Sequence, residues 1–411
     1  MSKWIKLKSI ADLTVGFVGT MAKHYENDGI PFLRSLNIKP FKIVNDDMKY
    51  ISQEFCEKIS KSILHEGDVV IVRTGLPGTC CVVPAEYDGC NCSDVVIVHP
   101  NTELVNAHYL AAFINIWGQR QIHNNKVGAI QQHFNVRSAE EMLIYLPEKE
   151  EQEKIAGVVV AINEKIENNN TICFELEAMA KTLYEYWFVQ FDFPDENGKP
   201  YRTSGGEMVW NEQLKREIPK RWKPIEYSEL VDIENSSINP SSFGETVMEH
   251  YSIPAFDEDC MPTFDTADTI QSGKYRVLKE SFLVSKLNPQ FKRIWDPYCL
   301  TDNAICSTEF MVYKPKDITL RPICYAIANS DGFYNHMVSK AISGSRKRIQ
   351  PDVSIKYSLA FPLDRFMVDR FCCHYSPIME KIKKARLENY ELKKLRDWLL
   401  PMLMNGQARV E

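Results

Sequence analysis

The sequence predicts an α+β fold, in which two mixed α/β domains are separated by two long helices that form an antiparallel coiled coil. Three observations predict it. Similar motifs recur about 216 residues apart, as with Gly128 and Gly344, which indicates an internal repeat of pseudo-two-fold character. Within each copy, β-branched runs alternate with Gly, Pro and Asn turns. A charged segment with heptad-spaced apolar residues follows each copy.

The order of the repeated motifs supports the duplication better than any single match does. Trp4 and Trp222 begin similar stretches, and the apolar runs at 69–72 and 282–285 correspond. Each copy has a predicted helix near its end, at about 106–122 and 320–337, followed by Leu146-Pro147 or Phe361-Pro362. Because the residue before a proline disfavours helix, each proline is expected to separate the last strand from the long helix.

The repeat divides the chain into five segments. The expected segments are a first domain at 1–147, a first spacer helix at 148–190, a connector at 191–221, a second domain at 222–363 and a second spacer helix at 364–411. Turn residues are dense in the connector, but four aromatic residues interrupt them, which favours a packed connector over a loose tether.

The two helical segments carry apolar residues in the alternating spacing of a coiled-coil seam. The predicted seam residues are Ile155, Val159, Ile162, Ile166, Leu176, Leu183, Ile378, Ile382, Leu392 and Leu399. A helix of roughly 40 residues would reach about 60 Å, and an antiparallel pair is the simplest way for the chain to return. The alternative is two independent surface helices, in which Asn169 and Asn389 would be solvated.

Composition favours a water-soluble intracellular protein. The chain has 411 residues, 44% of them hydrophobic, with a net charge of −6, which argues mildly against a nonspecific polyanion binder. Neither a signal peptide nor an apolar run of about 18 residues is found, so a cytoplasmic location without membrane contact is expected. Twelve scattered cysteines are expected to be reduced thiols.

Motifs for catalysis or for metal binding are weak. Asn288-Pro289-Gln290-Phe291 resembles the turn with which methyltransferases hold a base amine, but it has Gln at the second Pro position and lacks a Gly-rich loop. A phosphate-binding Gly-x-x-x-x-Gly-Lys loop is not found. Zinc could be held near Cys80-Cys81 or by Cys372-Cys373-His374, but adjacent cysteines are poor ligand pairs. We therefore expect no catalytic residue, metal or cofactor in this chain.

Two related domains on a rigid spacer could read two short DNA sequences at a fixed separation. Arg, Lys, Asn and Gln side chains on loops are suited to reading base edges. The candidate DNA-binding residues lie on corresponding loops of the two copies: Arg73, Thr74, Gln131, Gln132, Asn135, Lys286, Asn288, Arg293, Arg346, Lys347 and Arg348. A purely structural or solvated role stays open for each of them.

With these features assembled, the chain resembles the specificity subunits of Type I restriction-modification systems over essentially its whole length. The motifs that carry the resemblance are Leu146-Pro147 to Gln152 and Ile155, Phe191-Asp-Phe-Pro194 to Ile218-Pro219 and Trp222, and the loops at Gly128 and Gly344. The second spacer helix departs from the pattern, because Pro362-Leu-Asp-Arg-Phe lacks the Pro-x-x-x-x-Gln spacing.

The resemblance implies a non-catalytic subunit whose two target recognition domains read the halves of a split double-stranded DNA sequence. It implies two methyltransferase subunits docked on the spacer helices, together with restriction and translocase subunits. S-adenosylmethionine, ATP and Mg²⁺ would then be bound by those partner subunits. Two alternatives stay open: the equivalent subunit of a two-subunit restriction enzyme whose other chain both cuts and methylates, and a coiled-coil adaptor that binds only proteins.

Overall fold

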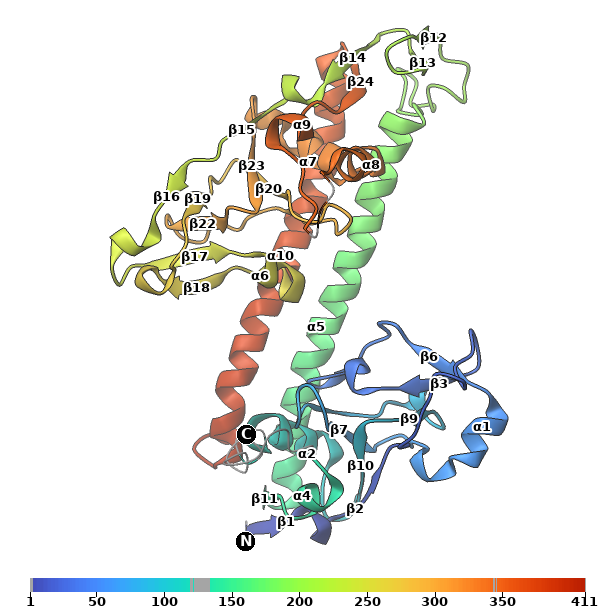
Figure 1. Ribbon diagram of the computed structural model, residues 1–411, viewed down its shortest axis with the longest axis vertical. Helices are drawn as coiled ribbons and strands as arrows, with labels where there is room; N and C mark the ends of the chain where they lie inside the picture. The colour runs from blue at the N-terminus through green and yellow to red at the C-terminus, as the bar shows by residue number, and fades with distance from the viewer. Residues whose placement is uncertain (1–2, 119–120, 122–133, 343, 345, 411) are drawn as a thin grey trace. The chain divides into compact units, whose positions relative to one another are not determined.

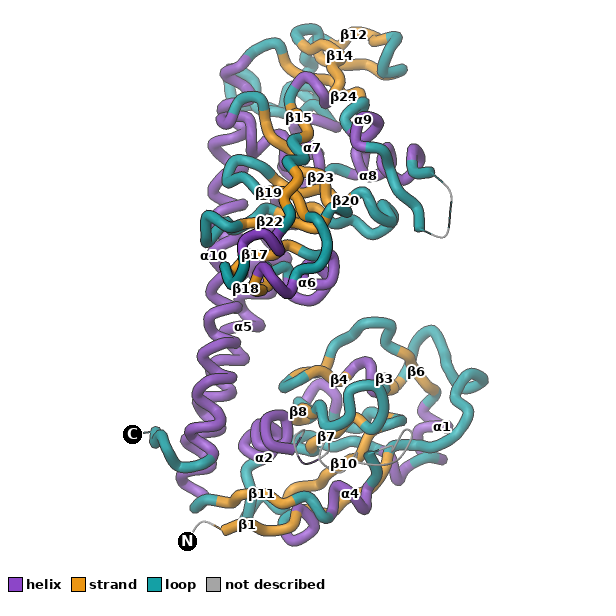
Figure 2. Tube along the Cα trace, turned by 60° about the vertical axis from the view of Figure 1, so that its left-hand side comes forward, coloured by secondary structure: helices purple, strands orange, loops and turns teal. Residues whose placement is uncertain are grey.

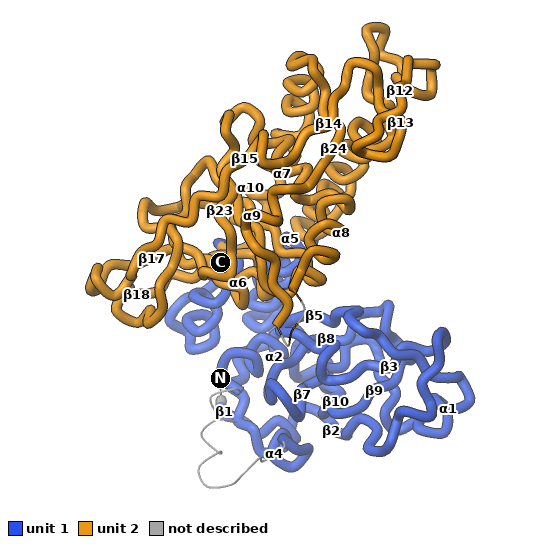
Figure 3. Tube along the Cα trace, turned by 45° about the horizontal axis from the view of Figure 1, so that its top comes forward, with its two compact units in different colours: residues 1–167, 391–411 blue, residues 168–390 orange. Residues whose placement is uncertain are grey.

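The computed structural model describes residues 3–118, 121, 134–342, 344 and 346–410 (Figure 1). The chain forms two compact units. Unit 1 consists of Met1–Glu167 and Glu391–Glu411, and unit 2 of Asn168–Tyr390 (Figure 3). The division between the units passes through both long helices and does not coincide with the boundaries of the five predicted segments. Those segments therefore stay a prediction. Within the described residues, no helix is both long enough and apolar enough to cross a membrane.

Unit 1 is built on a four-stranded antiparallel sheet in the order β2-β10-β7-β8. Its strands are β2 (Ala11–Val15), β7 (Val69–Val72), β8 (Cys80–Val82) and β10 (Val95–Pro100). Successive side chains of a strand point to opposite faces, so Val69 and Ile71 enter one core and Val70 and Val72 another. Burial on both faces explains why β7 consists only of Val and Ile.

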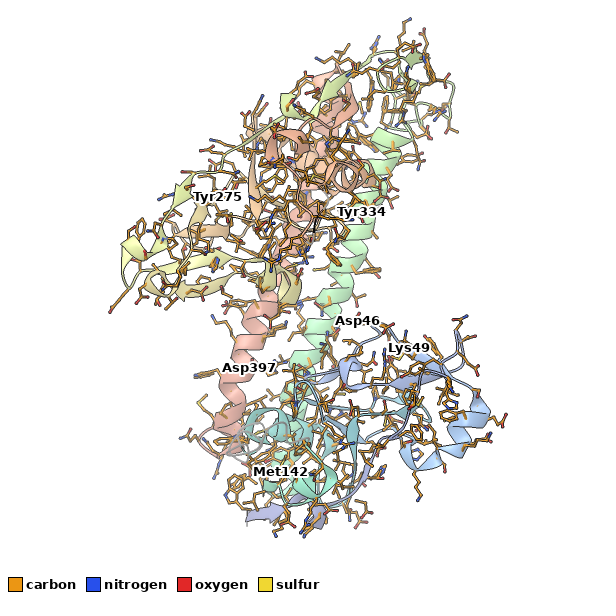
Figure 4. The ribbon with its side chains drawn as sticks, viewed as in Figure 1. Asp46, Lys49, Met142, Tyr275, Tyr334 and Asp397 are labelled. Atoms are coloured by element: carbon orange, nitrogen blue, oxygen red, sulfur yellow. The ribbon has the colours of Figure 1, made fainter. Side chains whose placement is uncertain are left out.

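Smaller elements complete unit 1. The short strands are β1 (Lys3–Lys6), β3 (Ile30–Leu33), β4 (Ile38–Lys39), β5 (Lys42–Ile43), β6 (Lys49–Ile51), β9 (Asn91–Cys92) and β11 (Leu143–Leu146). The short helices are α1 (Gln53–Lys58), α2 (Ala107–Phe113) and α4 (Val136–Glu140). Helix α2 covers the four-stranded sheet, and Met142, labelled in Figure 4, is buried in the same core.

Unit 2 repeats this plan (Figure 2). Its four-stranded antiparallel sheet has the order β15-β23-β20-β21. The sheet strands are β15 (Val231–Ile233), β20 (Phe282–Ser285), β21 (Ile294–Trp295) and β23 (Phe310–Pro315). The other strands are β12 (Met208–Asn211), β13 (Arg216–Pro219), β14 (Trp222–Glu226), β16 (Ser237–Ile238), β17 (Val247–Tyr251), β18 (Thr263–Thr266), β19 (Lys274–Arg276), β22 (Ala304–Ser307) and β24 (Ser358–Pro362).

The sheet topology confirms the internal duplication. In each copy the first strand pairs with the last, as β1 with β11 and β14 with β24. The four-stranded sheets have corresponding orders, and each copy has one parallel pair, β3 with β9 and β17 with β22. The strands of the four-stranded sheets and the pairs of first and last strands therefore occupy the same chain-order positions in two copies whose sequences have diverged widely.

The extent of one helix predicted from the sequence was wrong. The segment 320–337 forms two helices, α7 (Arg321–Asn329) and α8 (Asp331–Lys340), rather than one. Ser330 lies between them in an extended conformation, and its hydroxyl accepts a hydrogen bond from the Phe333 backbone N–H, so that it caps α8. Unit 2 also contains the short helices α6 (Ile253–Asp259) and α9 (Pro351–Ser354).

The long helices are α5 (Lys149–Tyr184) and α10 (Arg365–Met404). Within unit 2 they lie side by side and antiparallel (Figure 1). As the residue number rises along α5, that of the contacting residue on α10 falls: residue 169 contacts 389, residue 173 contacts 382 and residue 184 contacts 371. The faces with which the two helices contact each other are buried in the same core as the second domain. Ala180, Tyr375 and Ile378 are among the helix residues of this core. Leu176, Leu183 and Ile382 lie half-buried at its border.

Asn169 and Asn389 lie inside this helix interface and are not solvated. Only 2% of Asn169 and 7% of Asn389 is exposed, and the Asn169 amide donates to Asn389 Oδ1 at 2.9 Å. Asn169 also donates to Glu388, and Asn389 to Asn170. A buried amide pair is satisfied only in one register. The alternative of two independent surface helices is therefore wrong within unit 2.

Within unit 1, the other halves of α5 and α10 are also in contact. Ile155 and Val159 are buried in the same core as Leu400 and Leu403, and Arg396 donates to Asn163. Ile166 is buried, whereas Ile162, Leu392 and Leu399 are half-buried. Leu400 is 1% exposed, so it fills the interface more deeply than the predicted Leu399 does.

The connector is packed at its two ends. Phe191 and Phe193 are buried, and their rings contact Trp222 at centroid distances of 5.1 and 5.4 Å. Ile218, in the hairpin of β12 and β13, is 1% exposed and belongs to the same core. This aromatic cluster explains why the connector sequence interrupts its turn residues with aromatic ones.

Candidate nucleic-acid interface

In the second copy, the two predicted DNA-binding loops lie against each other. The Asn288 N–H donates to the Lys347 carbonyl at 2.7 Å, and the Ile349 N–H donates to the Lys286 carbonyl at 3.1 Å. Arg348 forms backbone bridges with both Leu287 and Ile342. The structure therefore brings Lys286, Asn288, Lys347 and Arg348 together at the end of β20, although 58 residues of chain lie between Asn288 and Lys347.

The first copy has the same arrangement at the end of β7. The Phe134 N–H donates to the Arg73 carbonyl at 3.4 Å, and Arg73 Nε donates back to the Phe134 carbonyl at 3.2 Å. Asn135 follows directly, and its side chain caps α4 by accepting from the Ser138 N–H. The predicted residues Gln131 and Gln132 lie outside the described residues. Arg73 and Asn135 thus hold the backbone in place on the loop predicted to contact DNA.

Each loop pair also receives an acidic residue from a neighbouring turn. Asp94 precedes β10, and its carbonyl accepts from the Arg73 N–H at 3.2 Å, while its carboxylate accepts from Thr74 Oγ1 at 2.7 Å. Glu309 precedes β23, and its carbonyl accepts from the Lys286 N–H at 2.9 Å. Neither acid was among the residues predicted from the sequence. Their offset of 215 residues, within one of the repeat spacing, is the signal that could have found them.

The Glu309 carboxylate is surrounded by cations. Arg348 donates to it from Nε at 3.1 Å and from Nη2 at 2.7 Å. The hydrogen bond from Arg348 lowers the pKa of Glu309, and the charges of Lys286 and Arg346 lower it further. Arg346 and Lys347 are exposed. One carboxylate facing three cations leaves a positive surface of the kind that attracts DNA phosphates.

Two of the remaining candidate residues have clear structural roles. Arg293 is only 12% exposed and donates to both oxygens of Asp257, at 2.6 and 2.7 Å. This geometry gives Arg293 a role inside the domain and does not support its predicted contact with a base. Asn288 has a φ of 47°, and Asn is among the residues that best tolerate this left-handed conformation. Tyr334, labelled in Figure 4, donates to the Gln290 carbonyl and so fixes the same loop.

Most of the cysteines considered for zinc are buried: Cys80, Cys81, Cys90 and Cys92 lie in the first domain and Cys372 on α10, whereas Cys373 is exposed. Cys80 and Cys81 are fully buried on opposite faces of β8, in different cores. Burial raises the pKa of Cys90 to about 12 and that of Cys372 to about 11, which opposes the thiolate form that binds metals. Among the described residues, no group of three or more His, Cys, Asp or Glu side chains could hold a metal ion.

Gln152, from the motif at the start of the first spacer helix, is 1% exposed and satisfies three backbone groups. Its carbonyl accepts from the Asn106 N–H at 2.9 Å, and its amide donates to the carbonyls of Leu104 and Pro147. The side chain therefore ties the start of α5 to the loop before α2.

Arg365, at the start of α10, makes the corresponding link in the second copy. It donates to Asp317 at 2.8 Å and to Thr319, both in the loop before α7. The second helix lacks the Gln motif, but a different residue joins the same elements. Arg365 was not predicted from the sequence, because an Arg after Pro362 has no pattern that distinguishes it from a solvated residue.

Comparison with known proteins agrees with this geometry. A family model described as "Type I restriction modification DNA specificity domain" matches residues 1–178. The Type I restriction enzyme MjaIX specificity subunit of Methanocaldococcus jannaschii is 21% identical over 430 residues, covering 99% of this chain and 93% of that protein. The HindI specificity subunit of Haemophilus influenzae is 29% identical over 101 residues, covering 24% of this chain and 22% of that protein.

The fold is also similar to a crystal structure of a Type-I restriction-modification system S subunit from M. genitalium. The TM-score is 0.60 at 13% identity, with 98% of this chain and 96% of that chain covered. The chain combines a duplicated α/β domain, corresponding loop contacts in the two copies and two long helices. In sequence and in fold the chain is similar to Type I restriction-modification specificity subunits.

Proposed function

We propose that the chain reads a bipartite double-stranded DNA target, with one half read by residues 1–147 and the other by residues 222–363, and that it catalyses no reaction itself. The observation that carries this proposal is the repeated loop pair, in which Arg73 contacts Phe134 and Lys286 contacts Ile349. Two surfaces of equal construction but different side chains are suited to two different short sequences.

The charges of the loops support direct contact with DNA. In the second copy Lys286, Arg346 and Lys347 have side chains without a hydrogen-bonding partner among the described residues, and Arg346 and Lys347 are exposed. Such cations can neutralise phosphates and fix the protein on the duplex, while residues that reach base edges supply the sequence preference. The net charge of −6 does not oppose this, because four cations, Lys286, Arg346, Lys347 and Arg348, lie on one pair of loops.

We further propose that two methyltransferase subunits bind the regions of the spacer helices, and that restriction and translocase subunits join this complex. S-adenosylmethionine, ATP and Mg²⁺ would be bound by those subunits. The links made by Gln152 and Arg365 support this, because both fix the start of a spacer helix to its recognition domain. A partner on either helix would therefore sit in a defined position relative to the reading loops of that domain.

A two-subunit restriction enzyme with a single cutting and methylating partner would use the same chain, and the genes next to this one distinguish the two systems. A coiled-coil adaptor that binds only proteins is disfavoured by the paired basic loops.

Genome methylation mapping in cells with and without this gene tests the proposed function. We expect two short half-motifs, separated by a constant number of unread base pairs, to be methylated only when the gene and its partners are present. A single uninterrupted motif, or no change in methylation, would contradict the proposal.

A further inference from the structure

The second domain contains two arginines that are held by a carboxylate in the same two-point geometry. Arg348 donates through Nε and Nη2 to Glu309, and Arg293 donates through Nε and Nη2 to Asp257. The two differ in exposure. The Arg293 side chain is 12% exposed and the Arg348 side chain 40%. Arg293 Nη1 is buried without a partner among the described residues, so only Arg348 can present a guanidinium edge to a ligand.

The exposed edge of Arg348 has a definite chemistry. A guanidinium has five N–H donors in a rigid plane. The edge formed by Nε and Nη2 is occupied by Glu309, whereas Nη1 has no hydrogen-bond partner among the described residues. The second edge, formed by Nη1 and the other Nη2 hydrogen, therefore stays available. Two parallel donors of this kind match the O6 and N7 acceptors that guanine presents in the major groove.

Both partners of this pair are fixed by backbone hydrogen bonds. The Arg348 carbonyl accepts from the Ile342 N–H at 2.8 Å, and Ile349 donates to Lys286. The Glu309 carbonyl accepts from Lys286, at the end of β20. Strand ends therefore hold the arginine and its carboxylate partner in one arrangement, as a side chain that discriminates between bases requires.

The charge distribution favours the same role. The neighbouring cations lower the pKa of Glu309, so its carboxylate is ionised at neutral pH and holds Arg348 by a charge-assisted contact. In the first domain Asp94 occupies the corresponding turn and holds the Thr74 hydroxyl at 2.7 Å. The turn acid is therefore a shared part of the two domains, while the side chain that it positions differs.

We propose that Glu309 is a positioning residue that orients Arg348 to recognise a guanine in the half-site read by the second domain. This inference rests on the proposed function. It assigns one base preference to one residue pair, and it predicts that loss of Glu309 relaxes specificity even though the surface becomes more positive.

The test uses the complete system in cells and the assembled complex in solution. Methylation mapping of the unaltered system first gives the two half-motifs. Glu309→Gln, Arg348→Gln and Arg348→Lys are then mapped, and competition binding measures the preference for G·C over other pairs at each position. We expect each variant to lose roughly ten- to hundred-fold of this preference at one position of one half-site. The other half-site should be unchanged.

Arg202→Gln and Glu217→Gln are matched controls, because this exposed pair lies in the connector, with its charged atoms 3.9 Å apart. They change the same charges and should leave both half-motifs intact. Unchanged preference in Glu309→Gln and Arg348→Gln, or an equal loss at both half-sites, would overturn the inference. Retained preference in Arg348→Lys would also overturn it, since a lysine supplies charge without the two-donor edge. Absence of any bipartite motif in the unaltered system would instead refute the proposed function.

Discussion

Individual residues join each recognition domain to its spacer helix, and they do so by different chemistry in the two copies. Gln152 is 1% exposed and forms hydrogen bonds with three backbone groups. Arg365 instead forms ion pairs and a contact with a hydroxyl group at the surface. A buried amide is costly to replace because every group that it contacts loses its partner. The first joint should therefore depend on a single side chain more strongly than the second.

Replacing Gln152 by Ala should destabilise unit 1 by at least about 2 kcal/mol, since unsatisfied buried groups cost about 1–3 kcal/mol each. Hydrogen exchange of the Asn106 amide, which donates to Gln152, should become faster. Gln152→Glu should also destabilise, because a carboxylate would face two carbonyl oxygens. Exposed Gln53, replaced by Ala, is the control. Equal exchange rates at Asn106 in Gln152→Ala and the unaltered chain would show that the link is not required.

At the scale of elements, the packing of α5 on α10 in unit 2 depends on an aromatic cluster. Phe371 is fully buried, and its ring contacts those of Tyr184, Trp187 and Phe188, the last at 4.9 Å. Aromatic rings supply large buried areas and favourable edge-to-face contacts. The seam is therefore stabilised both by this cluster and by the register of the Asn169–Asn389 pair.

Phe371→Ala should lower the stability of unit 2 by about 3–5 kcal/mol, because it removes a buried ring and leaves a cavity. Tryptophan fluorescence during urea unfolding measures this, and Trp187, whose ring lies 5.6 Å from that of Phe371, is one of the seven tryptophans that contribute to the signal. Phe366→Ala is the matched control on the same helix, because that side chain is 68% exposed, and its effect should stay below about 1 kcal/mol. Similar unfolding midpoints for the two variants would contradict the assigned packing.

The elements also show what sequence patterns can and cannot predict. The duplication, the seam and the correspondence of loops between the two copies were predictable, because periodicity and repeat offset reflect which faces are buried. The contact between two loops of one copy was not predicted. The break at Ser330 was missed, since a capping serine inside an apolar pattern resembles a tolerated polar residue. The pairing of Arg348 with Glu309, and the burial of Arg293, depend on contacts across 36 or more residues, which no local pattern encodes.

At the scale of the whole molecule, we propose that two separate domains read two half-sites and that the helices set the gap between them. Both helices are continuous through the point at which the compact units divide, next to Glu167 and Tyr390. Seven residues inserted into each helix at these points preserve the heptad register of the seam. They would add about 10 Å of helix, or about three base pairs of duplex at roughly 3.4 Å per pair.

Methylation mapping of this double insertion is the most direct test. We expect the same two half-motifs with a gap that is longer by about three base pairs. A seven-residue insertion between Glu212 and Lys215, in the turn joining β12 to β13, should leave the gap unchanged. Retention of both half-motifs with an unaltered gap in the double helix insertion would contradict the claim that the helices determine the spacing.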